Sequence, residues 1–136
     1  MSAPSVVRAL VVVTAVCAAV VLVALERSEE RCTDSVKAMF VALRDRVPEP
    51  QLNGTVADVE DDCSGSSRLV DSGAVLFQEG HPEQAAAVLR EAVEREPDSF
   101  SAWAGLASVL EQSDPAASSE AAARARELNS FYRPPS

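Results

Sequence analysis

The only histidine in the chain, His81, lies in the segment "EGHPEQA", with Glu79 and Glu83 two positions away on either side. An imidazole between two carboxylates is a combination that both acid-base catalysis and metal binding use. Metal binding needs three or four ligands, however, and neither cysteine outside the apolar N-terminal run is close to the histidine in the chain. Gly80 and Pro82 flank His81, which favours a solvated turn. We therefore predict no catalytic residue, no metal ligand and no cofactor, and a protein that is not an enzyme.

A second cluster of side chains that could do chemistry is acidic: Asp58, Glu60, Asp61 and Asp62. Compared with a calcium-binding loop of the helix-loop-helix type, Cys63 falls where the turn needs glycine, and Leu69 falls where the bidentate glutamate belongs. The spacing therefore predicts a solvated acidic loop without a bound ion.

Two cysteines, Cys32 and Cys63, lie outside the apolar run. An even number of cysteines in a small domain suits an oxidising compartment, so we predict a disulfide between them. Such a link would stabilise the fold by roughly 3 to 4 kcal/mol in the loop-entropy model. The alternative is two unpaired thiols that fill space.

An apolar run, "VVRALVVVTAVCAAVVLVAL" (residues 6–25), follows a short N-terminal tail, residues 1–5. At about 1.5 Å per helical residue, it spans roughly the 30 Å hydrocarbon layer of a bilayer. We predict an uncleaved single-pass transmembrane anchor, because the run is longer than a signal-peptide core and no small-x-small pair follows it. The alternative is a cleaved signal sequence, which would release a secreted structural or regulatory protein.

Two features disagree on which side of the membrane the C-terminal domain lies. Arg27, Arg31 and Lys37 follow the run whereas Arg8 alone precedes its core, which by the positive-inside rule favours the cytoplasm. The even cysteine count favours an oxidising exterior, and on this basis we predict an extracytoplasmic domain at the cell membrane. Residues 26–136 carry 11 basic and 21 acidic side chains, a net charge of −10, which disfavours nucleic acid as a partner.

Residues 34–47, "DSVKAMFVALRDRV", have apolar side chains at helical spacing and end before Pro48 and Pro50. They predict an amphipathic helix whose apolar face belongs to the core. Residues 49–67 show no sustained periodicity, although "GTVADV" within them could form a short strand. Residues 26–67 are therefore predicted to be an amphipathic helix followed by an acidic, cysteine-containing loop.

The pattern of the remaining residues predicts two successive units, each of which is a helix, a tight turn and a second helix. The helical stretches are "RLVDSGAVLFQ" with "EQAAAVLREAVER", and "FSAWAGLASVLEQ" with "ASSEAAARARELN". Gly80 can adopt the left-handed geometry that closes a helix, and Pro82 and Pro115 suit the first turn of the helix that follows. The predicted fold class is all-α.

These two hairpins resemble the tetratricopeptide repeat family in their register. We take Pro97 as the proline that closes a repeat and align the residues before it with one repeat of the family. The family's large, small and turn positions then fall on residues of the expected kinds, namely Leu69, Gly73, Leu76, Gly80, Ala85, Leu89 and Ala92. The next repeat begins in step, because Trp103, Leu106, Ala107 and Leu110 recur one repeat length after Leu69, Ser72, Gly73 and Leu76. Its second half fits if one residue is deleted at the turn. The resemblance covers residues 68–130, and residues 131–136 form a C-terminal tail.

The resemblance implies an α-solenoid fragment that works as a protein–protein interaction scaffold and binds a peptide or helix of a partner protein. It places the binding surface on the first helix of each repeat, at Val70, Ala74, Phe77, Ala104, Ser108 and Glu111. Family members that clamp a C-terminal carboxylate use Lys, Arg and Asn there, and the only lysine in this chain, Lys37, lies outside the repeats. Self-association is the alternative to binding another protein.

Overall fold

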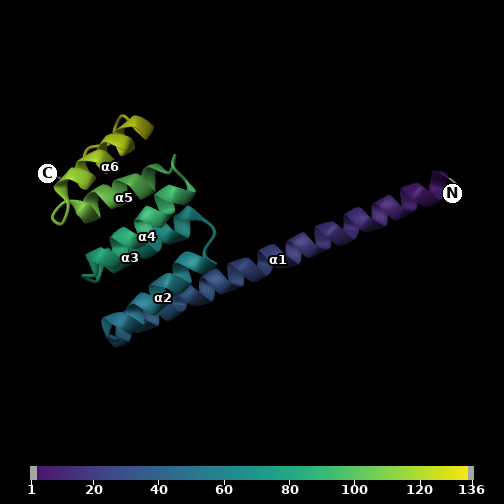
Figure 1. Ribbon diagram of the computed structural model, residues 1–136, viewed down its shortest axis with the longest axis horizontal. Helices are drawn as coiled ribbons and strands as arrows, with labels where there is room; N and C mark the ends of the chain where they lie inside the picture. Colours follow the sequence, from purple (N-terminus) through teal and green to yellow (C-terminus); the bar gives the residue numbers. More distant parts are fainter. Residues whose placement is uncertain (1–2, 135–136) are drawn as a thin grey trace.

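The computed structural model describes the backbone of residues 3–134 and the side chains of residues 10–134. The described residues form helices and no strand: α1 (Ala3–Asp45), α2 (Glu49–Asp62), α3 (Ser66–Gln78), α4 (Pro82–Arg95), α5 (Phe100–Leu110) and α6 (Pro115–Leu128). Consecutive helices pair as three hairpins, α1 with α2, α3 with α4 and α5 with α6 (Figure 1). The predicted all-α class of helix-turn-helix repeats is therefore confirmed.

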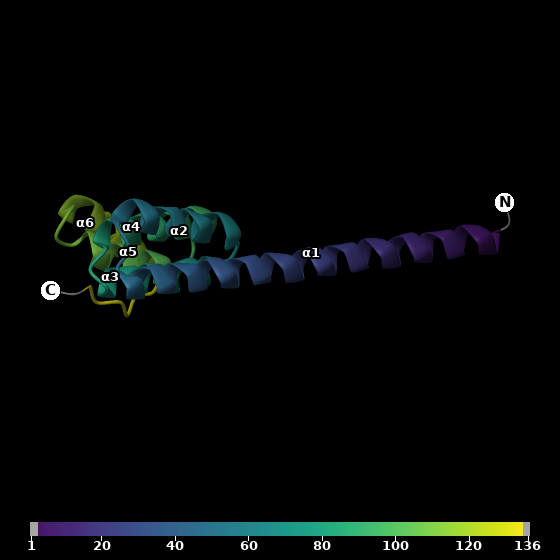
Figure 2. The same ribbon diagram turned by 90° about the horizontal axis from the view of Figure 1, so that it is seen from below.

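α1 extends far beyond the other helices as a single rod in both views (Figure 1 and Figure 2). Its apolar 18-residue window has a mean hydropathy of 2.3, and none of that window is buried against the rest of the protein. The helix is long and apolar enough to cross a membrane, a property that signal sequences share. The expected tail at residues 1–5 is helical from Ala3 onwards, and residues 1–2 lie outside the described residues.

The apolar run and the amphipathic helix expected at residues 34–47 form one continuous helix. From Cys32 onwards its inner face, which includes Met39 and Leu43, is buried, and α1 packs here against α2. No break separates the apolar run from the packed part of the helix. The direction of the apolar segment is therefore fixed by the packing of the second half of the same helix.

α2 occupies residues for which we expected an acidic loop or a short strand, so that expectation was wrong. Leu52, Val56 and Val59 follow one another at helical spacing and are buried on one face of α2. Pro50 lies in the first turn, where the missing N–H is not needed. Gly54, which suggested a turn, lies within the helix and faces open space. Burial against α1 therefore outweighs the weak helix propensity of this segment.

The turn between α3 and α4 follows the expected chemistry. Gly80 has a φ of +86°, the left-handed region that favours glycine. The His81 N–H donates to the Leu76 carbonyl at 2.9 Å, and Pro82 opens α4. The turn between α5 and α6 lacks glycine, and here the Asp114 side chain accepts from the Ala117 N–H at 3.1 Å. Both repeats thus close their hairpins, by different means.

One apolar core runs through all three hairpins. Leu69, Ser72, Gly73 and Leu76 are buried on α3, and Leu106, Ala107 and Leu110 are buried at the corresponding places on α5. Trp103 is half-buried, and its indole N–H donates to the Pro97 carbonyl at 2.9 Å. Ala121, Ala122 and Ala125 of α6 are buried at the places that correspond to Val88, Leu89 and Ala92 of α4. The sequence separation between corresponding residues of α4 and α6 is one residue shorter than that between corresponding residues of α3 and α5. This difference agrees with the one-residue deletion at the turn of the second repeat that the sequence register requires.

The N-terminal hairpin repeats the same spacing. The first residues of α2, α4 and α6 are equally spaced along the sequence, and so are their last residues. The last residues of α1 and α3 are separated by the same number of residues. The backbone bond that closes the second helix recurs as well: Cys63 donates to Val59, Glu96 to Ala92 and Asn129 to Ala125. The structure therefore contains three hairpins in register, the number that repeat stacks usually need for stability.

The C-terminal segment folds back along the last hairpin. The Tyr132 ring meets the Phe100 ring edge-on, with centroids 5.4 Å apart. Phe131 stays 88% exposed. Of the expected tail, residues 131–136, the last two lie outside the described residues.

Candidate partner-binding groove

A groove runs between α3 and α5, which lie side by side in the stack. Its first part, of about 170 Å³, is lined by Val70, Ala74, Phe77, Gln78, Leu89, Gly105, Ser108 and Val109. Its second part, of about 340 Å³, continues to the ends of the two helices and is lined by Phe77, Pro82, Ser108, Val109, Glu111, Gln112 and Ser113. Phe77, Ser108 and Val109 border both parts, so the two form one continuous groove.

The structure brings most of the residues expected on the binding surface to this groove. Val70, Ala74, Phe77, Ser108 and Glu111 line it. Ala104 is half-buried on α5 and lines neither part. Phe77 is the aromatic residue of the groove and is 43% exposed, a surface that a partner side chain can cover.

The floor of the groove depends on a contact between one large residue and two glycines. Leu89 of α4 is 1% exposed, and its Cγ lies 2.7 Å from the position that a Cβ on Gly73 would take. A Cβ on Gly105 would lie 3.1 Å from the Leu89 Cδ2. The two glycines therefore allow α3 and α5 to approach Leu89 from both sides. The role of Gly73 follows from the register, whereas we did not predict that of Gly105, whose one signal is a glycine inside a helical stretch.

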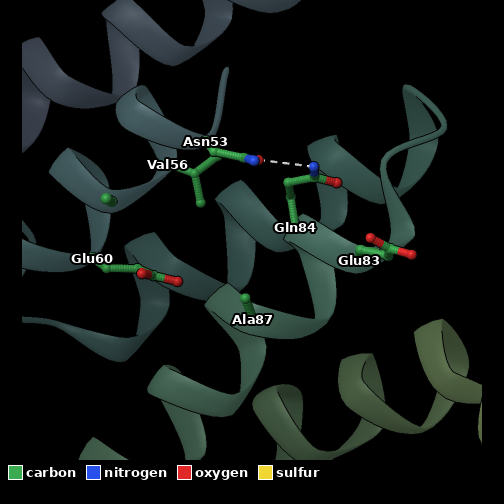
Figure 3. Close-up of a pocket in the computed structure, with 7 residues that line it drawn as sticks. Asn53, Val56, Glu60, Glu83, Gln84 and Ala87 are labelled. Carbon is green, nitrogen blue, oxygen red and sulfur yellow. Dashed lines mark hydrogen bonds between the residues drawn. The ribbon is translucent and has the colours of Figure 1, made fainter. Parts of the chain in front are cut away.

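A shallower pocket of about 260 Å³ lies between α2 and α4 (Figure 3). The Gln84 side-chain amide Nε2 donates to the side-chain oxygen Oδ1 of Asn53 across it at 2.9 Å. Burial raises the pKa of Glu60 at its edge, Glu91 and Asp61 raise it further, and Arg95 opposes them. We did not predict this pocket, because it depends on α2 being a helix. Among the described residues, no three His, Cys, Asp or Glu side chains form a group that could hold a metal ion.

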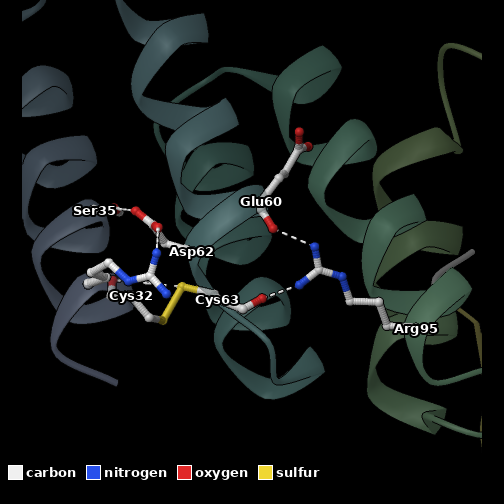
Figure 4. Close-up of a disulfide and its surroundings, with 7 residues drawn as sticks. Cys32, Ser35, Glu60, Asp62, Cys63 and Arg95 are labelled. Carbon is white, nitrogen blue, oxygen red and sulfur yellow. Dashed lines mark hydrogen bonds and ion pairs between the residues drawn. A yellow bond between two sulfur atoms is a disulfide. The ribbon is translucent and has the colours of Figure 1, made fainter. Parts of the chain in front are cut away.

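The two cysteines outside the apolar run meet at the junction of α1 and α2 (Figure 4). The sulfur atoms of Cys32 and Cys63 lie 2.09 Å apart, at bonding distance, and both residues are buried. Beside them, Ser35 Oγ donates to Asp62 Oδ2 at 2.5 Å. The end of α2 is thus attached to α1 about two helical turns after the apolar run ends.

Arg95 attaches the same end of α2 to α4. Its guanidinium donates to the carbonyl oxygens of Glu60 and Cys63 (Figure 4). It also donates to the carboxylate of Glu91, at 2.7 Å. The final carbonyls of a helix have no partner within the helix, so these bonds satisfy groups that would otherwise need water. One side chain therefore links α2 and α4.

His81 lies at the N-cap position of α4 and makes no side-chain capping bond. Glu79 and Glu83 are exposed at the same turn. The segment is the corner of a hairpin, as its glycine and proline indicate.

Three helical hairpins in register, with a groove between the first helices of the second and third, define a helical repeat protein. Residues 68–109 match the model of the tetratricopeptide repeat family. The matched range covers most of α3, all of α4 and most of α5, which are the helices that build the groove. The family predicted from the register is thereby confirmed. The comparison with curated proteins found no match.

Proposed function

We propose that the protein is a membrane-anchored, non-catalytic interaction module whose groove between α3 and α5 binds a peptide or helix of a partner protein. The observation that carries this proposal is the groove itself, where the exposed Phe77 and the neighbouring Val70 and Ala74 lie above the buried Leu89. The proposed contact surface is the one that the repeat register indicates: Val70, Ala74, Phe77, Ala104, Ser108 and Glu111. The match of residues 68–109 to the tetratricopeptide repeat family supports a role in protein–protein interaction.

The continuity of α1 supports an anchor that holds this module close to the bilayer. The apolar run ends at residue 25, and the packed part of the helix begins at Cys32. At 1.5 Å per residue, the exposed helix between them is about 10 Å long. The closeness of two buried cysteine sulfurs favours an oxidising compartment and hence the extracytoplasmic side.

Photo-crosslinking in native membranes tests the groove. A photoreactive phenylalanine analogue replaces Phe77 in one variant and Glu94, which is exposed on α4, in a matched control. We expect the first variant to give a discrete crosslinked product that the control does not give. Equal products from both positions, or none from Phe77, would contradict binding in the groove.

Lys37 allows a test of the anchor and of its orientation, because it is the only lysine and its side chain is 69% exposed. A membrane-impermeant amine reagent should label Lys37 in intact cells, and Lys37→Arg should abolish that label at this peptide. Labelling only after lysis would place the domain in the cytoplasm. Recovery of a shortened chain outside the membrane fraction would instead support the secreted alternative.

A further inference from the structure

We infer that the partner segment bound in the groove between α3 and α5 is apolar and basic, with Lys or Arg beside its apolar side chains. The inference rests on the proposed function, that the groove binds a polypeptide. It adds the chemistry of the partner, which the family match does not give.

The apolar requirement follows from the walls and floor of the groove. Val70, Phe77 and Val109 contribute side chains to its lining, and Leu89 closes its floor. A partner gains by burying apolar side chains here, since removing apolar surface from water is favourable. The part nearest the helix ends has the larger volume, about 340 Å³, and its lining includes the charged side chain of Glu111.

The basic requirement follows from the charges of the elements that build the groove. Among its lining residues, the charged one is Glu111, which is exposed. Residues 69–89 and 96–123, which include nearly all of α3 and the whole of α5 with the turns that follow them, contain no Lys or Arg. The basic residues of α3 and α4, which are Arg68, Arg90 and Arg95, lie outside these ranges and do not line the groove. Their charged residues, His81 aside, are Asp71, Glu79, Glu83, Glu96, Asp98, Glu111, Asp114 and Glu120.

Several acidic side chains on α3, α4 and α5 and the turns that follow them have no basic partner among the described side chains. Asp71, Glu79, Glu83 and Glu111 form no ion pair among residues 10–134. Arg95, on the adjacent α4, is bonded to Glu91 and to the end of α2 instead. A basic segment would therefore meet uncompensated negative charge, whereas an acidic segment would be repelled.

Peptide binding to the full-length chain in nanodiscs of a zwitterionic lipid tests the inference. Three fluorescent peptides share the same leucines at helical spacing and carry lysine, glutamine or glutamate at the remaining positions. We expect the lysine peptide to bind at least threefold more tightly than the glutamine peptide, and the glutamate peptide to bind most weakly. The advantage of lysine should shrink as salt is raised, because exposed charges are screened.

Two substitutions identify the charge that is responsible. Glu111→Gln should reduce the preference for lysine over glutamine. Glu120→Gln, an equal change of charge at an exposed position of α6 outside the groove, should leave that preference unchanged. Equal affinity for the three peptides, or an equal effect of the two substitutions, would overturn the inference.

Phe77→Ser separates failure of the inference from failure of the proposed function. Phe77 is partly exposed, so circular dichroism should show the helices intact. If Phe77→Ser weakens all three peptides equally and they bind alike, the groove binds polypeptides but does not select basic ones. If no peptide binds, or if Phe77→Ser has no effect, the groove is not the site and both proposals fail. A homodimer that dissociates on Phe77→Ser would show that the groove holds a second copy, which also overturns the inference.

Discussion

The central hairpin, α3 with α4, contacts its two neighbours in different ways. Toward α5 the contact is apolar, because Leu89 lies between Gly73 and Gly105. Toward α2 polar bonds are added to the shared core, chiefly those of Arg95 to the carbonyls at the end of α2. The Gln84–Asn53 bond lies at the same junction.

This difference separates the recognisable repeats from the hairpin that attaches them to the anchor. The junction between α4 and α5 lies within the residues that match the repeat family. The junction between α2 and α4 joins that region to a hairpin outside the match, which we propose is held at the membrane by α1. Close packing holds the first junction, whereas a charged side chain contributes bonds to the second. We therefore expect core substitutions to affect the first junction and charge substitutions to affect the second.

The largest effect is expected from Leu89→Ala, which removes the floor of the groove and leaves a cavity between α3, α4 and α5. Losses of about 2 to 5 kcal/mol are typical for such a change at a buried leucine. Urea unfolding of the full-length chain in mild detergent, followed by circular dichroism, measures it. Phe131→Ala, at an 88% exposed position, is the control and should change little. A loss below about 1 kcal/mol would show that the packing of α5 does not depend on Leu89.

Removal of both sulfurs at the α1–α2 junction, by Cys32→Ala with Cys63→Ala, should lower stability by about 3 kcal/mol if the pair is oxidised. The cause is the freedom that the unfolded chain regains without the link. The unreduced wild-type chain should also resist alkylation at both positions. Cys17→Ala, which removes the exposed cysteine of the apolar run, is the control. Full alkylation without reductant would show that the two thiols are unpaired.

Arg95→Ala should cost about 1 to 3 kcal/mol, because it leaves two helix-end carbonyls and Glu91 without a donor. Arg90→Ala removes the same side chain from an exposed position of the same helix and should have little effect. Hydrogen exchange should rise in α2 more than in α5 if Arg95 acts at the α2 junction. Equal loss of protection in α2 and α5 would contradict the proposed difference between the two junctions.

Much of the two recognisable hairpins and of the groove followed from the sequence, because their signals are local. Gly80 and Pro82 mark the turn, and the recurrence of Leu69 and Leu76 at Trp103 and Leu110 sets the register. That register also placed Phe77 and Glu111 on the surface that the structure shows as a groove. The spacing of side chains along a helix decides which of them share a face, so no long-range information was needed.

The N-terminal hairpin was harder to predict, because α2 gains its stability from burial against α1. Its asparagine and glycine are turn formers, and they outweighed a short apolar stripe in our interpretation. A signal was present, since Leu52, Val56 and Val59 precede Ala85, Leu89 and Ala92 at one constant offset that is close to a repeat length. The role of Arg95 had no such signal. Its carbonyl partners, in Cys63 and Glu60, are distant in the chain and meet it only in the folded structure.

The smallest effect, and the finest test of the polar junction, concerns Glu60 beside Arg95. Burial, Glu91 and Asp61 raise the pKa of Glu60 above its ordinary value of 4.5. The folded state therefore holds this proton more tightly than the unfolded state, so the ionised carboxylate lowers stability at neutral pH. That cost is relieved as the pH falls through the raised pKa toward 4.5.

Glu60→Gln should therefore stabilise the protein slightly at pH 7, by less than about 0.5 kcal/mol because solvent screens a half-buried group. The gain should disappear at a pH below about 4.5, where Glu60 is protonated and its side chain is as uncharged as that of glutamine. Melting temperatures of the two proteins across this range measure it, with Glu94→Gln on the exposed side of α4 as the matched change of charge. If Glu60→Gln destabilises the protein at pH 7, the attraction of Arg95 outweighs burial and the neighbouring carboxylates. The junction would then be held by an ion pair as well as by the bonds of Arg95 to the backbone.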